Sequence, residues 1–233
     1  MSSYSPVSKG FVTLVIASGA AVLIDALAHW RSVKLTEFLA LLVFSVVASR
    51  CRVKLPGLTG SMSVNLPFIL MAAAELNMAE ALVVGCLSTL AQCLPSAGKS
   101  FNVVRALFNF ANMALAVGAT RLLYDSATLR TGVASSQMLL AIATAGFFVV
   151  NSAPVAIVIA LTENKNPVRT WGNMFQLSFP YYLASAGVAA AVVSVAGHIT
   201  WQAPVAMLLL MLGLFHSYRR YFSEADQALQ AVR

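Results

Sequence analysis

Eight long apolar segments, separated by charged residues, proline and glycine, constrain the fold of this chain more than any other feature. Continuous apolar runs of about 20 residues are typical of helices that cross hydrocarbon, whereas the strands of a membrane barrel alternate apolar and polar residues over about ten positions. The segments cover residues 11–30, 35–49, 61–76, 79–97, 103–124, 136–161, 177–197 and 202–217. The sequence therefore predicts an all-α fold, a polytopic bundle of transmembrane helices.

The low charge of the chain indicates that its side chains face lipid. Charged residues make up 10% of the 233 residues and the mean hydropathy is +0.80, whereas an average soluble domain has about 25% charged residues. The net charge of +7 comes from basic residues that stand singly or in small groups between apolar runs. That spacing marks helix ends and does not form the basic stripe of a nucleic-acid-binding surface. We expect the lipid bilayer as a partner, and no nucleic acid.

The distribution of Lys and Arg predicts the topology. If eight spans follow a cytoplasmic N-terminus, eleven of the 15 basic residues fall on the cytoplasmic side and four on the other. Segments 35–49, 61–76 and 202–217 are shorter than the roughly 20 residues that a span needs, so one of them could re-enter the same side. The prediction is about eight membrane segments, between six and eight, with both termini cytoplasmic, in a multi-pass protein of the bacterial inner membrane. Residues 1–217 would form the transmembrane domain and residues 218–233 a short cytoplasmic helix.

Polar side chains inside the apolar segments are the candidates for a ligand site, because each costs free energy at membrane depth unless it is paired. Asn109 and Asn112 are three residues apart, with Arg105 one turn before Asn109, which predicts a polar stripe on one helix face. Asn151 and Gln92 are further candidates for lining the site. The alternative is that these amides only join helices by hydrogen bonds.

Carboxylates near the predicted outer ends of the helices are a second set of candidates. Asp25 and His29 lie one turn apart and could carry protons or bind a cation. The alternative is that Asp25 simply reaches the membrane interface. Glu75 and Glu80 flank a tight turn, and we expect both to be solvated.

The sequence lacks the motifs of several enzyme classes. It contains no HExxH, GxSxG or Walker A pattern, and its cysteines form no CxxC pair. Cys86 and Cys93 lie on one predicted segment about 10 Å apart, too far for a disulfide. We expect no enzyme activity, no cofactor and no metal site.

The run NKNPVRTWGNMFQLSF, residues 164–179, predicts a helix that lies at the cytoplasmic headgroups. Trp171 would anchor this helix, and Tyr181 and Tyr182, directly after Pro180, would be further interface anchors. The alternative is a simple loop.

Five runs occur in a recognisable order: LPGLTGSMSVNLPFILMAAAEL, VVRALFNFANMALAVGATRLLYD, FFVVNSAPVAIVIAL, TWGNMFQLSFPYYLASAGVAA and SYRRYF. Together they resemble bacterial membrane-associated sensor domains that precede HD-GYP, GGDEF or histidine-kinase output domains. The resemblance implies a Gly-Ser entry to a short third span, asparagines in spans five and six, and a tyrosine-rich signal exit helix. The matching residues are Gly60, Ser61, Asn109, Asn151, Trp171, Tyr181, Tyr182, Tyr218 and Tyr221. Because the sequence ends about a dozen residues after Tyr221, we expect no output domain here, so that a signal would pass to a separate protein.

These features favour a stand-alone sensory module that binds a small or lipid-like ligand near the asparagines. The main alternative is a small-molecule transporter, or the substrate-capturing subunit of an importer that depends on an energising protein. A membrane enzyme that acts on lipid-linked substrates is a third interpretation. A separate signalling or energising protein, or a second copy of the chain, would be the protein partner.

Overall fold

The computed structural model of the chain describes residues 6–31, 34–54, 61–95, 101–126, 131–132, 135–195 and 202–231. Its helices follow the predicted apolar segments closely. In chain order the elements are α1 (Pro6–Ala28), α2 (Leu35–Ser49), β1 (Arg52–Lys54), β2 (Ser61–Ser63), α3 (Leu66–Glu75), α4 (Met78–Cys93), α5 (Val103–Asp125), α7 (Ser136–Glu163), α8 (Pro167–Val195) and α9 (Gln202–Ala231). The described fold is helical, as the apolar runs predict, apart from one ribbon of two short strands.

Side-chain caps explain where several helices begin. Asn77 precedes α4 and its side chain accepts a hydrogen bond from the amide of Glu80, at 2.9 Å. Asn102 precedes α5 and accepts from the amide of Arg105, and Ser135 precedes α7 and accepts from the amide of Met138. Each cap satisfies an amide of the first helical turn that has no partner within the helix.

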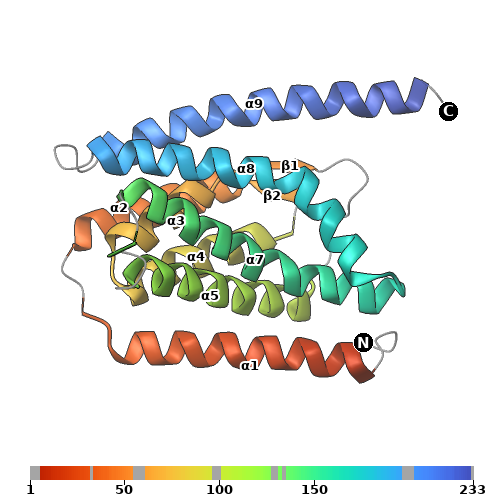
Figure 1. Cartoon of the computed structure of the whole chain (residues 1–233), viewed down its shortest axis with the longest axis horizontal. Coiled ribbons are helices and arrows are strands. Elements are labelled where there is room, and N and C mark those ends of the chain that lie inside the picture. The colour runs from red at the N-terminus through yellow and green to blue at the C-terminus, as the bar shows by residue number, and fades with distance from the viewer. Residues whose placement is uncertain are drawn as a thin grey trace.

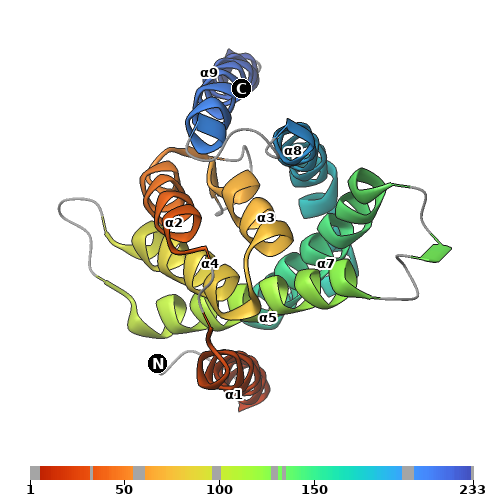
Figure 2. The same ribbon diagram turned by 90° about the vertical axis from the view of Figure 1, so that its left-hand side faces the viewer.

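The helices lie side by side in a bundle, with their axes roughly aligned (Figure 1). Viewed along the bundle, α3 lies in the middle, and α2, α4, α5, α7 and α8 surround it (Figure 2). Helix α1 packs on the outside against α5, and α9 lies on the opposite side of the molecule. The Pro6 end of α1 and the Ala231 end of α9 lie at the same end of the bundle.

Helix α1 approaches α5 closely because the contact is made by small residues. A Cβ added at Gly19 of α1 would overlap the backbone of Ala111 in α5. Farther along the same contact, a Cβ added at Gly118 of α5 would stand 3.2 Å from the side chain of Val22 in α1. Such small-residue contacts are common between membrane helices, because they let two backbones approach.

The segment predicted at 61–76 differs from the prediction, because only its second part is helical. Residues 61–63 form β2, which pairs antiparallel with β1 in a register that places Arg52 opposite Ser63. Helix α3 starts at Leu66 with Pro67 in its first turn, a position where the missing N–H of proline costs nothing. With 10 residues, α3 is about 15 Å long, half the thickness of the hydrocarbon. Residues 66–73 of this short central helix are all buried.

Residues 167–179 belong to α8 and do not form a separate helix at the headgroups or a loop. Pro180 lies inside α8, and Figure 1 shows the first part of α8 turned away from the direction of the rest. A proline removes one hydrogen bond from the helix ladder and commonly bends it. Helix α9 likewise runs without a break across the boundary that was predicted between residues 217 and 218.

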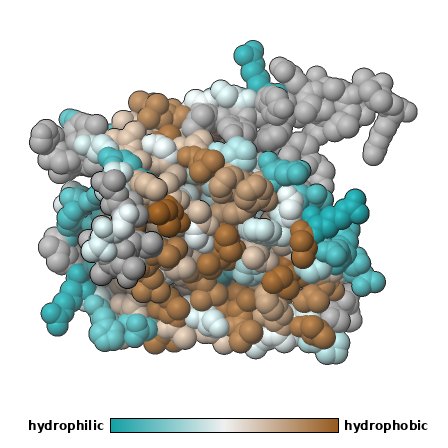
Figure 3. Space-filling view, viewed as in Figure 1, coloured by the Kyte–Doolittle hydropathy of each residue, from teal (hydrophilic) through white to brown (hydrophobic). Residues whose placement is uncertain are grey.

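The outer surface is apolar over much of its area. In Figure 3, brown side chains cover much of the middle of the molecule, and teal ones lie mainly toward the ends of the helices. Leu14, Ile24, Val43, Leu122 and Leu209 are each more than half exposed. Within the described residues, α1, α5 and α7 are long and apolar enough to cross a membrane, and α2, α3, α4 and residues 204–217 of α9 are shorter apolar helices. This surface fits contact with lipid.

Candidate functional site

A chain of hydrogen bonds joins three helices in the interior of the bundle. The side-chain amide of Asn112 in α5 donates to the backbone oxygen of Asn151 in α7, at 2.8 Å, and to its side-chain oxygen, at 3.2 Å. The amide of Asn151 in turn donates to the hydroxyl of Tyr182 in α8, at 2.9 Å. We call Asn112, Asn151 and Tyr182 the amide network. It links residues that lie 39 and 31 positions apart in the sequence.

The amide network has unused hydrogen-bonding capacity at both ends. Asn112 is only 2% exposed, and its side-chain oxygen is buried without a hydrogen-bond partner among the described residues. At the other end, the Tyr182 hydroxyl accepts from Asn151, and the described part of the chain offers no acceptor for its hydrogen. An unpaired buried acceptor costs about 1–3 kcal/mol, which makes it uncommon in a settled interior.

A cluster of aromatic side chains lies beside the amide network. The ring of Phe148 in α7 contacts the ring of Tyr182 at a centroid distance of 4.9 Å. The same ring contacts Phe179 at 5.4 Å and Phe175 at 5.5 Å, and Phe175 stacks on Phe179 at 4.5 Å. We call Phe148, Trp171, Phe175 and Phe179 the aromatic cluster. It gives the network an apolar border along the α7–α8 contact.

The predicted stripe of Arg105, Asn109 and Asn112 does not act as a single stripe. Asn109 faces α4 instead of α7 and donates to the sulfur of Cys93, at the end of α4, at 3.5 Å. Arg105 is exposed. Because residues three positions apart differ by about 60° around a helix, Asn109 and Asn112 reach helices on different sides of α5. Gln92 is half-buried near the end of α4 and takes no part in the amide network.

The residues predicted as interface anchors make their polar contacts within the protein. Tyr181 is 8% exposed, and its hydroxyl donates to the backbone oxygen of Ser63 in β2, at 2.5 Å. Tyr182 belongs to the amide network, and the indole of Trp171 donates to the Ser152 hydroxyl, at 2.8 Å. The polar groups of all three side chains are used inside the protein. Sequence reasoning assigned them to headgroups because tyrosine and tryptophan after a basic loop are typical of an interface.

The remaining sequence candidates lie outside the amide network. Asp25 and His29 are 79% and 78% exposed at the end of α1, where the ring Nδ1 of His29 lies 2.8 Å from the backbone oxygen of Asp25. Tyr218 and Tyr221 lie on α9, but their side chains are outside the described residues, as are Gly60 and the side chain of Ser61. Among the described residues, no group of three His, Cys, Asp or Glu side chains could hold a metal ion.

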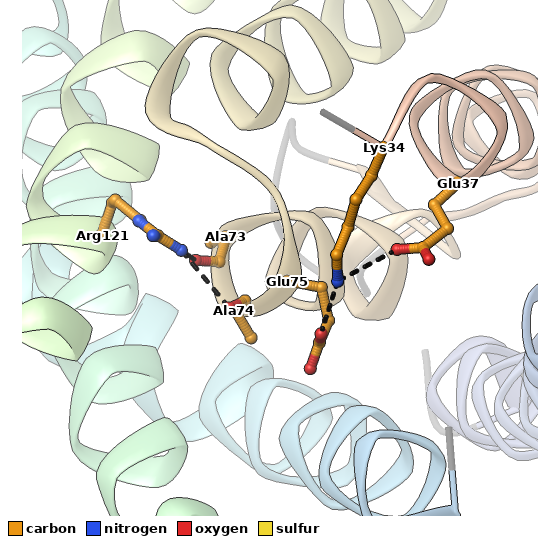
Figure 4. A network of polar contacts seen from close by, with 6 residues as sticks. All are labelled: Lys34, Glu37, Ala73, Ala74, Glu75 and Arg121. Atoms are coloured by element: carbon orange, nitrogen blue, oxygen red, sulfur yellow. Dashed lines mark hydrogen bonds and ion pairs between the residues drawn. The ribbon is translucent and has the colours of Figure 1, made fainter. Parts of the chain in front are cut away.

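A second polar group, at the far end of α3, was missed by the sequence analysis (Figure 4). Arg121 of α5 donates to the backbone oxygens of Ala73 and Ala74, at 2.8 Å and 3.3 Å, and pairs with Asp125 at 2.6 Å. Lys34 lies between Glu37 and Glu75, at 3.4 Å and 3.6 Å. We call Arg121, Lys34 and these partners the α3 clamp. The last turn of α3 could have indicated such a group, because the final carbonyls of a helix have no partner within the helix and need donors from elsewhere.

Glu80 also departs from the expectation that both carboxylates of the turn are solvated. Its side chain is 1% exposed, whereas Glu75 is half-buried and paired with Lys34. Glu80 lies in the first turn of α4, where the helix dipole stabilises a negative charge.

Comparison with known proteins identifies the family. A family model for MASE9, a membrane-associated sensor domain, matches residues 21–212, which include the amide network, the aromatic cluster and the α3 clamp. No curated protein and no solved structure matches the chain. The resemblance that was drawn from the sequence motifs is thus confirmed at the level of the family. The chain belongs to the MASE9 family of membrane-associated sensor domains.

Proposed function

We propose that this sensor domain binds a small or lipid-like ligand at the amide network and passes its occupancy through α9 to an output partner. The single observation that carries the proposal is the unpaired, buried side-chain oxygen of Asn112 at one end of the network. A ligand that offers a hydrogen-bond donor would remove the cost of that oxygen. The aromatic cluster would take the apolar body of the same ligand.

Simple interhelical bonding accounts for the network less well. Asparagines that only join helices can use their amide and carbonyl groups on each other, and such bonds contribute about 1 kcal/mol. Here the amide of Asn112 is used twice and its oxygen not at all, within the described residues. That asymmetry favours a site that is completed by a molecule from outside the chain.

The proposal includes a topology of eight membrane segments with both termini in the cytoplasm of a bacterial cell. The basic residues support it, because eleven of 15 then lie on the cytoplasmic side. The shared position of the Pro6 and Ala231 ends of the bundle also supports an even number of crossings. Labelling of single cysteines in intact cells tests it: Ser217→Cys should be protected from a membrane-impermeant reagent, and His29→Cys should react. Reaction at both positions would contradict the topology.

Thermal stabilisation in detergent tests ligand binding. The purified chain would be screened against metabolite mixtures and against polarity-separated fractions of a bacterial inner-membrane lipid extract. A fraction that raises the unfolding midpoint of the parent should have no effect on the double variant Asn112→Leu/Asn151→Leu. The matched control is Asn109→Leu, which removes an amide from the α4 side of α5 and should keep the response. Equal stabilisation of all three proteins would refute the proposed site.

Transport remains a second candidate because of one observation, the half-length helix α3 in the core. Short helices that stop within the membrane form the substrate sites of many transporters. Uptake of the stabilising fraction into sealed vesicles that contain the chain would favour transport. Binding without uptake, with or without added energy sources, would favour sensing.

A further inference from the structure

We propose that the neighbouring residues Tyr181 and Tyr182 couple the amide network to the β1–β2 ribbon and, through it, to α9. The inference rests on the proposed function, since it names the route by which the occupancy of the network reaches the exit helix. Its physical basis is that two adjacent side chains of one helix are hydrogen-bonded to two different parts of the molecule.

The two tyrosines leave α8 in different directions. Successive residues of a helix point about 100° apart, and the two rings stand at 88° to each other with their centroids 6.2 Å apart. The Tyr182 hydroxyl meets Asn151 in α7, and the Tyr181 hydroxyl meets the backbone oxygen of Ser63 in β2. A rotation or tilt of this turn of α8 therefore displaces both contacts together.

Pro180 places a weak point in the helix directly before these tyrosines. Proline has no N–H, so the carbonyl of Gln176, four residues earlier, lacks its ladder partner. The change of direction of α8 in Figure 1 agrees with such a break. The turn that carries Tyr181 and Tyr182 can thus reorient without bending an intact hydrogen-bond ladder.

The ribbon connects Tyr181 to α9. Ser63 stands opposite Arg52 in β1, and β1 is in contact with α9. The hydroxyl of Ser63 also donates to the side-chain oxygen of Asn65. The side-chain amide of Asn65 in turn donates to the hydroxyl of Ser88 in α4, at 3.0 Å. The ribbon is thereby held against α4, and a shift of the Ser63 carbonyl is carried by backbone pairing to β1 beneath α9. Helix α8 also touches α9 directly, and the experiment below separates the two routes.

Hydrogen–deuterium exchange of α9 residues 202–217, measured on the full chain in detergent, tests the coupling without any ligand. Asn151→Leu removes the partner of Tyr182 and should raise the exchange of α9 about fivefold, the change that corresponds to one lost hydrogen bond. In a Tyr181→Phe background, the same Asn151→Leu change should alter α9 exchange by less than about twofold, because the link to the ribbon is already missing. Tyr182→Phe, which keeps the ring, should reproduce Asn151→Leu and replaces it if that variant folds poorly.

Ser178→Ala is the matched control, because among the described residues the Ser178 hydroxyl donates to the backbone oxygen of Met174 within α8 and to no other group. In the Ser178→Ala background, Asn151→Leu should still raise α9 exchange about fivefold. The proposal is overturned if Asn151→Leu and Tyr182→Phe leave α9 exchange unchanged. It is also overturned if these changes raise α9 exchange as much in the Tyr181→Phe background as in the parent protein. Failure of ligand binding in the thermal assay would leave this result intact, so the two proposals fail separately.

Discussion

Two polar regions on the same helix, α5, are built in opposite ways. Arg121 near the end of α5 donates through Nη1 to two backbone oxygens of α3 and pairs through Nε with the carboxylate of Asp125. Asn112, nine residues earlier, has an amide with two acceptors and an oxygen with none among the described residues. The α3 clamp is thus closed by the protein itself, whereas the amide network is left open.

This difference distinguishes buried polar groups that hold the fold together from buried polar groups that are available to a ligand. A buried polar group that is fully paired holds the fold together, and its loss leaves its partners unpaired. A buried group that stays unpaired lowers stability, and a bound molecule that pairs with it removes that cost. The clamp should therefore matter most for stability, and the network for ligand response.

The largest expected effect comes from opening the clamp. Arg121→Leu removes the donor to the backbone oxygens of Ala73 and Ala74 and breaks the ion pair with Asp125, and should lower the unfolding free energy by about 3 kcal/mol. Thermal unfolding in detergent measures it as a fall of the midpoint. Arg105→Leu, at an exposed arginine of the same helix, is the control and should have almost no effect. Equal losses of unfolding free energy in both variants would show that Arg121 contributes no more to stability than an exposed arginine does.

The next effect concerns the border of the network. Trp171→Phe keeps an aromatic ring against Phe148 but loses the hydrogen bond to Ser152, and should cost about 1.5 kcal/mol. Ser152→Ala should cost a similar amount, and the double variant no more than either single one. Additive losses in this double-mutant cycle, measured by thermal unfolding, would show that the two side chains do not act as a pair.

Removing the amides should disturb stability little. In Asn112→Leu/Asn151→Leu, removal of the unpaired oxygen offsets part of the lost hydrogen bonds, whereas the Tyr182 hydroxyl loses its donor, so the unfolding free energy should fall by only about 1 kcal/mol. The same variant should lose the ligand response. A loss as large as that of Arg121→Leu would mean that the network is a structural bond like the clamp.

The smallest effect belongs to the outer part of the clamp. Lys34 and Glu75 are partly exposed, so Lys34→Gln should cost only about 0.5 kcal/mol. The cost should shrink as the salt concentration rises, because exposed ion pairs are screened. Unfolding curves at low and high salt measure it, and a cost that is independent of salt would place the pair in a more secluded environment.

The helices could be predicted from the sequence because a helix that contacts lipid needs a long apolar run, and charged residues or proline mark its ends. The runs at 35–49 and 103–124 match α2 and α5 within a residue at each end. The ribbon could not be predicted, because three-residue strands such as Ser61–Ser63 are too short to show an alternating pattern.

The candidate site could be predicted in part. Asn112 and Asn151 stood out because amides are uncommon at membrane depth, and the structure brings them together. The separation of Asn109 from Asn112 depends on which helices flank α5, and the spacing along one helix does not contain that information. The roles of Tyr181 and Tyr182 depend on contacts with α7 and β2 and were hidden for the same reason.

Native mass spectrometry of the chain, released gently from the membranes in which it is expressed, tests the open network most directly. The parent protein and Asn109→Leu should each retain a non-covalently bound molecule of the same added mass. Asn112→Leu/Asn151→Leu, although equally folded, should appear without it. The same bound masses in all three proteins would contradict the account, because the unpaired oxygen of Asn112 would then take no part in binding.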